Sequence, residues 1–580
     1  MNYLQRISDH LAQLDKHPRR CMWGCVAFTI IYYLLISLQG VDFADEGFSL
    51  TFYQNIYTHP YDVEYLFLYY MTGIIGGIWE MIFAPLGTYG YRILFAVTSG
   101  AIVLTLFATL KPYIKTSTLT LGAIACTIWP GLCLYYFNHD CLTILLFLLT
   151  IYSMMKGLDG KRWAWYAMGV FLVLNTSTRL PNVLLCILIF IPLVEAGFSG
   201  NYTQAMGNML RIAGGMIITS AIWIVAMLLL DHLGIYFSAL GSLFIMSEDS
   251  SDTHSIKNLL ITYSYTYKAI LTSTFYGIAV YFIYAISTQY IKIKNIKLIA
   301  GIVCCAIIYS LLIRNIYAMW GCLTAASILY TFLHRHNSQL FILGIASLVM
   351  LVVIPLGGDS YRNICHSCMW LGMPIFITLL RQPLKWHISL TNDEHYKYGI
   401  TIDNASREVE IILTVAFLIF SATHSVCYFD NGSRWEKNTR PQVEKVTTYT
   451  SHQRAELIES IVNTTLAHRS EGNYLLVFDN APMLHYLTGM QPYLGSPWGT
   501  FWGKDMFTRR LTQAENYNLQ LPLIAIPQFY YQDLSATNYL DPIQHPEMIE
   551  KIEALYSFMQ RHSYIEVHRD NYIILYKPAH

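Results

Sequence analysis

Long apolar stretches follow one another through most of this sequence, and they leave few ways for it to fold. They extend to about residue 427, and most of them approach the ~20 residues that a helix needs to cross the hydrocarbon core of a bilayer. Only 13% of the residues are charged, against roughly 25% in an ordinary soluble protein. The sequence therefore predicts an α-helical polytopic membrane protein. Its net charge of zero gives it no general attraction to nucleic acid.

We predict about thirteen membrane-spanning helices. The basic residues Lys16, Arg19 and Arg20 stand just before the first of them, and basic flanks stay in the cytoplasm, so the N-terminus is predicted to be cytoplasmic. An odd number of spans then puts the C-terminus outside. The predicted spans are 21–38, 91–110, 118–137, 141–155, 163–175, 182–196, 212–230, 269–287, 298–313, 318–333, 340–356, 368–380 and 409–427.

Within this transmembrane domain, residues 1–427, the segment 39–90 contains no Lys or Arg and is predicted to be the first external loop. Its stretch 65–84 is apolar enough to cross the membrane. The positively charged residues of the later loops lie mainly on the cytoplasmic side only if 65–84 does not cross the membrane. We therefore interpret 65–84 as interfacial helices along the outer surface. Residues 231–268 are predicted to be a long external loop, which forms a lid over the site or is disordered. Residues 382–408 are predicted to be a polar cytoplasmic loop.

Residues 428–580 are more polar and contain turn signals, which predicts a small α/β domain on the outer face. Short apolar runs predict strands at 474–479 and 521–526, and a hairpin that joins 564–568 to 572–576. Amphipathic periodicity predicts helices at 454–467 and 546–561. Loops at 479–482 and 495–502 carry polar and aromatic side chains that could stack on a glycan or pack the domain against the membrane part.

Acidic residues at the outer ends of the predicted spans are the first candidates for a functional site. Asp42, Asp45 and Glu46 follow the first span, and Asp140 stands in a very short turn between two spans. Ionisable side chains beside a bilayer are costly and often functional. The alternatives are solvated loop acids for the first group and a helix N-cap for Asp140.

Positive residues at external span ends are the second group of candidates. Cations on the side where topology disfavours them indicate an anion to be bound, and the guanidinium fork of Arg suits phosphate. The alternative is that they snorkel or pair with the acids. These residues are Arg179, Lys257, Lys268, Arg314 and Arg362.

Together, these acids and cations predict transfer of a group from a lipid phosphate. One carboxylate would remove a proton from an attacking acceptor hydroxyl, and the cations would stabilise the phosphate that leaves. A second acid would position the acceptor or hold a divalent ion.

In its order of motifs, the sequence resembles the type C membrane glycosyltransferases, in the branch of the protein O-mannosyltransferases and the lipid A aminoarabinose transferases. Asp45-Glu46 matches the acidic pair of that family's first external loop. His59-Pro60 is similar to a His-Pro-Pro motif, with Tyr61 in place of the second Pro, and Tyr91-Arg92 matches the start of the second span.

The resemblance continues through Asp140, which falls where the family has a second acidic residue. It extends to about residue 373 and includes the segments 179–182 and 357–360, which look like patterns of bacterial members. The predicted topology, with an outer C-terminal domain, is also similar.

The resemblance implies inverting transfer of a sugar from a polyprenyl-phosphate donor to a hydroxyl of a lipid, glycan or protein acceptor, in a bacterial inner membrane. Asp45 would be the general base, and Glu46 and Asp140 would assist through hydrogen bonds or through a divalent cation such as Mg²⁺, Mn²⁺ or Zn²⁺. His59 and Arg92 would belong to the acceptor side of the loop. The donor phosphate would lie among Arg179, Lys268, Arg314 and Arg362.

The main alternative is a transporter or flippase of lipid-linked saccharides. Transporters usually carry functional polar residues near the midplane and contain internal repeats, whereas the candidates here gather at span ends. A polymerase or ligase with an oligosaccharide donor and a non-catalytic scaffold are further alternatives. A scaffold leaves the acidic pair and the outer cations without a role.

Overall fold

The computed structural model describes most of the chain. The described residues are 13–128, 134–248, 255–290, 296, 299, 303, 316–353, 356, 366–381, 384–389, 397–402, 427–469, 473–517 and 520–579. The predicted spans 298–313 and 409–427 lie almost wholly outside the described residues.

The N-terminal half is helical from Pro18 onward. Its elements are α2 (Pro18–Ile36), α3 (Asp45–Asn55), η1 (Pro60–Tyr69), α4 (Tyr70–Phe83), η2 (Ala84–Leu86), α5 (Gly87–Leu110), α6 (Thr116–Ile128), α7 (His139–Leu158), α8 (Arg162–Thr178), η3 (Leu180–Phe190), α9 (Ile191–Ser199) and α10 (Tyr202–Leu229). Six of the predicted spans correspond to α2, α5, α7, α8, η3 with α9, and α10. The predicted span 118–137 is too long, because α6 ends at Ile128 and the described residues 134–138 are not helical.

The helices after α10 are α11 (Leu233–Glu248), α12 (Ile256–Tyr290), α14 (Ile316–Leu333), α15 (Ser338–Val353) and α16 (His366–Arg381). The predicted spans 318–333, 340–356 and 368–380 correspond to α14, α15 and α16, and 269–287 lies within α12. The long loop predicted at 231–268 is wrong in its described part, because α11 and the first turns of α12 occupy it. Strands β1 (Leu384–Ser389) and β2 (Lys397–Ile402) form an antiparallel hairpin in the segment predicted to be a polar loop.

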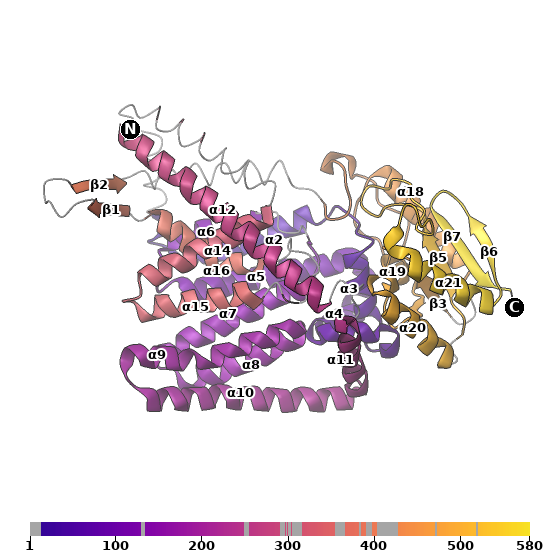
Figure 1. Cartoon of the computed structure of the whole chain (residues 1–580), viewed down its shortest axis with the longest axis horizontal. Helices are drawn as coiled ribbons and strands as arrows, with labels where there is room; N and C mark the ends of the chain where they lie inside the picture. The colour runs from indigo at the N-terminus through magenta and orange to yellow at the C-terminus, as the bar shows by residue number, and fades with distance from the viewer. Residues whose placement is uncertain are drawn as a thin grey trace.

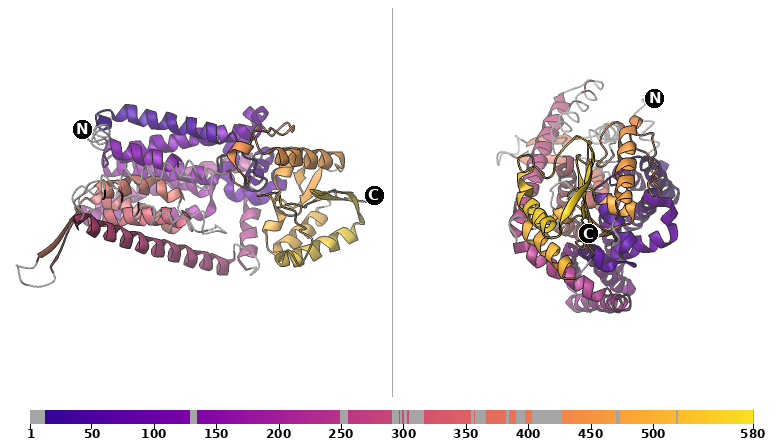
Figure 2. Two further views of the ribbon diagram at one scale, coloured as in Figure 1. Left: turned by 90° about the horizontal axis from the view of Figure 1, so that it is seen from above. Right: turned by 90° about the vertical axis from the view of Figure 1, so that its right-hand side faces the viewer.

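Most of these helices run along the long axis of the molecule, and the C-terminal region lies at one end (Figures 1 and 2). Helix α8 packs between α7 and α10, α2 packs on α5, and α14 packs on α16. Many apolar side chains face outward, such as Leu210 at 70% and Leu229 at 82% exposure. Among the described residues, five helical segments are long and apolar enough to cross a membrane. The chain is a multi-pass α-helical membrane protein.

The C-terminal region, residues 427–579, carries a sheet whose strand order is β4-β3-β5-β7-β6. Strands β3 and β5 are parallel, and β7 joins β5 and β6 as an antiparallel strand. The predicted strands and both predicted helices are present. The elements are η4 (Arg434–Glu436), α18 (His452–Ala467), β3 (Tyr474–Val477), α19 (Met483–Thr488), β4 (Gln491–Pro492), η5 (Gly499–Phe501), α20 (Lys504–Asn516), β5 (Leu523–Pro527), η6 (Pro546–Met548), α21 (Ile549–Arg561), β6 (Tyr564–Arg569) and β7 (Ile573–Pro578).

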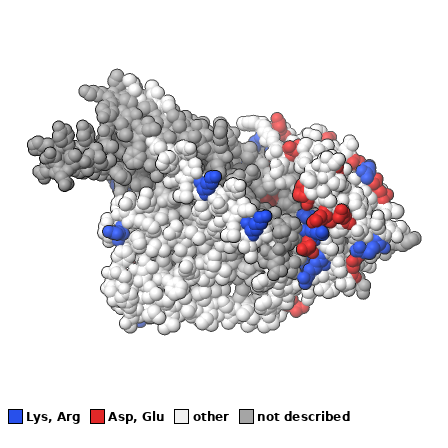
Figure 3. Space-filling view, viewed as in Figure 1, with Lys and Arg blue, Asp and Glu red and all other residues white. Residues whose placement is uncertain are grey.

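Charged side chains are distributed unevenly over the surface. In the view of Figure 3, acidic and basic residues gather over the C-terminal region, whereas the described surface of the helical part is nearly free of charge. This contrast is expected when apolar helices face lipid and the C-terminal region faces water.

Candidate active site

The acidic loop between α2 and α3 lies where the helical part meets the C-terminal region (Figure 1). Asp42 is buried, and its carboxylate accepts hydrogen bonds from the backbone N–H groups of Ala44 and Glu46, each at 2.8 Å. These N–H groups stand at the start of α3, where helical donors need an acceptor. Asp42 therefore fixes the turn that presents the next two acids.

A close backbone approach holds α3 against the C-terminal region. The backbone N–H of Met483 donates to the carbonyl of Phe43 at 2.9 Å. At Gly47, a Cβ atom would stand 2.1 Å from the backbone nitrogen of Met483, so only glycine permits this approach. The first turn of α3 thus rests directly on the start of α19.

Glu46 forms a buried ion pair with Arg92 of α5. The Nε and Nη2 atoms of Arg92 donate to Oε1 and Oε2 of Glu46 at 2.9 Å and 2.7 Å. The same guanidinium also donates to the backbone carbonyls of Ser37, Gln39 and Gly40. A paired charge with this many acceptors is satisfied in a buried position. Glu46 and Arg92 therefore tie the acidic loop to α5.

Asp45 is half-buried, and its Oδ2 accepts a hydrogen bond of 2.6 Å from the hydroxyl of Tyr428. Tyr428 belongs to the C-terminal region, 383 positions further along the chain. Burial and the negative charges of Asp45 and Asp42 raise the pKa of Tyr428 above its usual value. The phenol therefore stays protonated and donates to the carboxylate of Asp45.

Negative charge is concentrated around this carboxylate. Burial and the charge of Asp45 raise the pKa of Asp42 well above its usual value, against the opposing effect of the two backbone hydrogen bonds. Burial, followed by the charges of Asp45 and Asp42, also raises the pKa of Tyr136. The pKa values of Asp42 and Tyr136 are thus both shifted by burial and by neighbouring carboxylates, and clusters of shifted pKa values recur at functional sites.

A second buried charge cluster joins the C-terminal region to the acidic loop. Asp430 accepts the backbone N–H of Val41 at 2.9 Å, and it pairs with Lys437 at 2.6 Å and with Arg454 at 3.2 Å. Arg454 also donates to the carbonyl of Val41 and to the carbonyls of Tyr531 and Gln532. Both polar groups of the Val41 backbone are therefore held by this cluster.

Asp140 lies half-buried in the first turn of α7. Asn138, and not Asp140, provides the N-cap, because its side chain accepts from the backbone N–H groups of Asp140 and Cys141. The carboxylate of Asp140 lies 3.6 Å from His139 Nε2, and Arg179 lies within electrostatic range of His139. The hydroxyl of Tyr53 in α3 donates to the carbonyl of Phe137, which brings this turn against the helix that starts with Asp45.

The other predicted site residues are spread more widely. Arg179 is buried at the end of α8 and donates to the carbonyl of Leu356. Lys257 and Lys268 are exposed on α12, and His59 is exposed before η1. Arg314 and Arg362 lie outside the described residues.

No group of three or more His, Cys, Asp or Glu side chains within the described part of the chain is arranged to hold a metal ion. Of the three predicted ligands, Glu46 has both carboxylate oxygens engaged by Arg92. Asp45 and Asp140 are half-buried, and a divalent cation held by Asp45, Glu46 and Asp140 stays a prediction.

The sequence does not predict the partners that complete the site. It predicts only a separate domain for the segment that contains Tyr428 and Arg454, and the predicted span 118–137 includes Tyr136. No local pattern marks these residues. Only the position of Tyr428 directly after the last predicted span places it at a membrane end.

The chain resembles type C membrane glycosyltransferases of known structure. It aligns with the crystal structure of ArnT from Cupriavidus metallidurans bound to undecaprenyl phosphate, at 11% identity and a TM-score of 0.48, over 95% of this chain and 97% of that chain. It also aligns with the archaeal oligosaccharyltransferase AglB from Archaeoglobus fulgidus, in complex with an inhibitory peptide and a dolichol-phosphate. That alignment has 9% identity and a TM-score of 0.47, over 96% of this chain and 74% of that chain.

No family model matches the chain, and no curated protein matches its sequence. Because the TM-scores lie below 0.5 and the identities near 10%, the two likenesses do not assign an activity to this chain.

Proposed function

We propose that this protein is a membrane glycosyltransferase that moves a sugar from a polyprenyl-phosphate donor to a hydroxyl acceptor at the outer face of the membrane. The observation that carries the proposal is the hydrogen bond from Tyr428 to Asp45, which orients a half-buried carboxylate at the junction of the helical part and the C-terminal region. A carboxylate so held is suited to act as a general base.

In the proposed reaction, Asp45 accepts the proton of the acceptor hydroxyl. At the same time, the oxygen of that hydroxyl attacks the anomeric carbon of the donor sugar. A carbon–oxygen bond to the acceptor forms as the bond to the lipid phosphate breaks. Attack from the face opposite the phosphate inverts the anomeric configuration. Tyr428 orients the base, and Asp42, Glu46 and Arg92 hold the loop that carries it.

The phosphate is proposed to leave toward Arg179, at the end of α8. Arg179 is 6% exposed, and it approaches His139 in the turn that carries Asp140. A guanidinium there would offset the charge that develops on the phosphate. Lys268, Arg314 and Arg362 stay predictions as further phosphate contacts.

A divalent cation also stays a prediction. It would be supported if dialysis against a chelator abolished transfer and if Mg²⁺, Mn²⁺ or Zn²⁺ restored it.

The hydroxyl of a lipid, glycan or protein could act as acceptor. We place the protein in a bacterial inner membrane with a cytoplasmic N-terminus, and accessibility labelling of single cysteines at both ends would test this.

The decisive experiment measures transfer of radiolabelled sugar from a panel of polyprenyl-phosphate sugars into membrane extract. Wild-type protein is compared with Asp45→Asn in matched amounts. Asp231→Asn is a suitable control, because Asp231 is an exposed carboxylate with a backbone φ of +56°, which asparagine tolerates well.

We expect transfer by the wild type and by Asp231→Asn, and a loss of about 100-fold or more for Asp45→Asn, as is usual for removal of a general base. Equal transfer by all three proteins would contradict the role of Asp45. If none of them transfers any sugar of the panel, the proposed function fails, and flipping of lipid-linked saccharides becomes the next activity to measure.

A further inference from the structure

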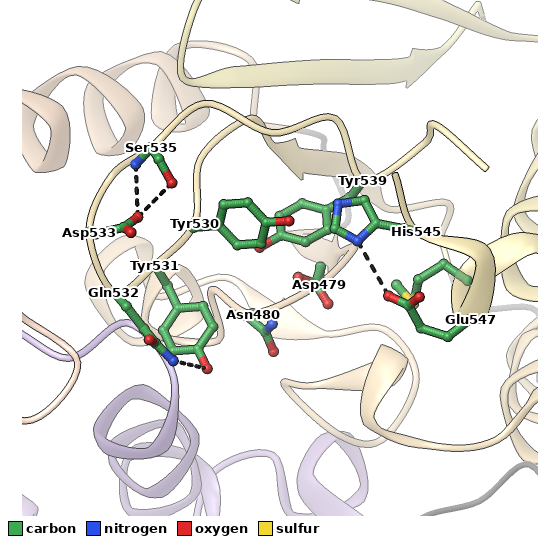
Figure 4. Close-up of a pocket in the computed structure, with 11 residues that line it drawn as sticks. Asp479, Asn480, Tyr530, Tyr531, Gln532, Asp533, Ser535, Tyr539, His545 and Glu547 are labelled. Atoms are coloured by element: carbon green, nitrogen blue, oxygen red, sulfur yellow. Dashed lines mark hydrogen bonds and ion pairs between the residues drawn. The ribbon is translucent and has the colours of Figure 1, made fainter. Parts of the chain in front are cut away.

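A second candidate site is a cavity of about 490 Å³ in the C-terminal region. It lies between the loop that follows β3 and the segment between β5 and η6 (Figure 4). Exposed side chains of Gln532, Asp533 and Ser535 lie at its rim. Asp479, Tyr539 and His545 line it deeper, with exposures of 7%, 3% and 5%.

Two polar groups in the deep part of this cavity, Oδ2 of Asp479 and the hydroxyl of Tyr539, form no hydrogen bond of good geometry among the described residues. The two groups are neighbours, because burial and the charge of Asp479 together raise the pKa of Tyr539. Figure 4 shows Asp479 directed toward the tyrosine rings. Buried polar groups are nearly always paired, and these two face one cavity without a well-formed hydrogen bond between them, so a ligand there could satisfy both groups.

The pair also selects the chemistry of that ligand. A carboxylate oxygen needs a donor, and a phenol that gives its proton needs an acceptor. An alcohol hydroxyl provides both in one group. An ammonium group can only donate, and a phosphate dianion can only accept.

The other walls suit an uncharged ring with apolar faces. The rings of Tyr530, Tyr539 and His545 pack together, with centroids 6.0 Å apart for the two tyrosines and 4.7 Å apart for Tyr539 and His545. Tyr531 lies on the other side, next to Asn480 (Figure 4). Aromatic faces stack on the C–H faces of sugar rings, and the volume falls in the range of about 300–1,000 Å³ typical of small-ligand pockets.

The charges around the cavity disfavour anions. Three carboxylates line it, and no Lys or Arg does so among the described lining residues. Asp533 accepts from Ser535, and Glu547 pairs with His545, which leaves Asp479 as the carboxylate that can receive a ligand hydroxyl. A uronic acid or a phosphate would bring like charge to this carboxylate.

The cavity is connected to the acidic loop through one side chain. Arg454 donates to the carbonyls of Tyr531 and Gln532 at the cavity and to the carbonyl of Val41 beside the acidic loop. The same arginine therefore holds both the wall of the cavity and the backbone of the segment that leads to Asp45.

We propose that this cavity binds an uncharged sugar residue, with one hydroxyl between Asp479 and Tyr539, and that this residue belongs to the acceptor. The second part rests on the proposed function, whereas the binding of sugar does not. The acceptor would accordingly be a glycan or a glycolipid.

Saturation-transfer NMR on the full-length protein in detergent tests the binding. The probes are methyl glycosides of glucose, galactose, mannose and N-acetylglucosamine, with methyl glucuronide as the anionic comparison. The proteins are the wild type, Asp479→Ala, Tyr539→Phe, the transfer variant Asp45→Asn, and Asp505→Asn as a control at an exposed carboxylate of α20.

We expect at least one uncharged glycoside to give a signal with the wild type, Asp45→Asn and Asp505→Asn. The signal should fall about tenfold or more in Asp479→Ala, since a hydrogen bond to a charged group is lost, and by less in Tyr539→Phe. The proposal is overturned if no uncharged glycoside binds, if the glucuronide binds better, or if Asp479→Ala binds as the wild type does. If a glycoside binds but the protein transfers no sugar, the proposed function is contradicted and the sugar-binding site is not.

Discussion

Replacement of Asp479 by Asn should stabilise the C-terminal region at neutral pH. Burial raises the pKa of Asp479 from 3.8 to about 6. A carboxyl group whose pKa is higher in the folded state opposes folding once it ionises, so stability is lost as the pH rises from 3.8 through 6. The shift of about 2.2 pKa units corresponds to about 3 kcal/mol at pH 8, because each unit is worth about 1.36 kcal/mol.

Hydrogen–deuterium exchange of β5 peptides in the full-length protein measures this effect at pH 4 and pH 8. The gain of Asp479→Asn over the wild type should grow by about 2.4 kcal/mol between these pH values, because part of the effect is already present at pH 4, and this is roughly 60-fold in the opening constant. Any effect of the asparagine amide on stability that does not depend on pH is the same at both pH values, so it cancels when the two stability differences are subtracted. Asp505→Asn is the control, at an exposed carboxylate. A pH-independent difference between Asp479→Asn and the wild type would refute the reasoning.

Three further predictions concern the contacts around Asp45. Tyr428→Phe should reduce kcat by about 10- to 100-fold with little change in thermal stability, since one hydrogen bond to a carboxylate is worth about 1.5–3 kcal/mol; normal kcat would contradict it. Glu46→Gln should destabilise the protein by about 3–5 kcal/mol by leaving the charge of Arg92 buried without its partner, and a thermal midpoint equal to that of the wild type would argue against this. Arg454→Lys should cost about 2–4 kcal/mol, because a lysine cannot serve the carbonyls that Arg454 holds, and faster exchange of its neighbouring amides should report the loss.

Much of the fold could be predicted because membrane spans and amphipathic elements leave local patterns. The hairpin of β6 and β7 follows from two apolar runs around a short polar turn. The long loop expected at 231–268 shows where this reasoning fails. The predicted topology treats 231–268 as a connection between two spans, although the apolar composition of its first part favours the helix α11. The distribution of Lys and Arg indicates on which side of the membrane a loop lies, but it does not show whether a segment is helical.

The site was predictable only for residues that are close in sequence. Asp45 and Glu46 are adjacent, yet the structure gives them different partners: a phenol for Asp45 and a guanidinium for Glu46. Which of two neighbouring acids is tied up and which stays half-buried depends on the direction each side chain takes from α3. That direction is set by contacts with α5 and with Tyr428, and no sequence pattern encodes contacts over such separations.

The orientation of Asp45, the proposed base, therefore depends on the docking of the C-terminal region. Val41 is held on both backbone groups, by Asp430 on its N–H and by Arg454 on its carbonyl. Tyr428 lies two residues before Asp430, so the segment that holds the loop also orients Asp45. Because buried charges tolerate little rearrangement, this junction has few alternative arrangements. A glycosyltransferase built in this way would have its base correctly placed only when the region that receives the acceptor is in position.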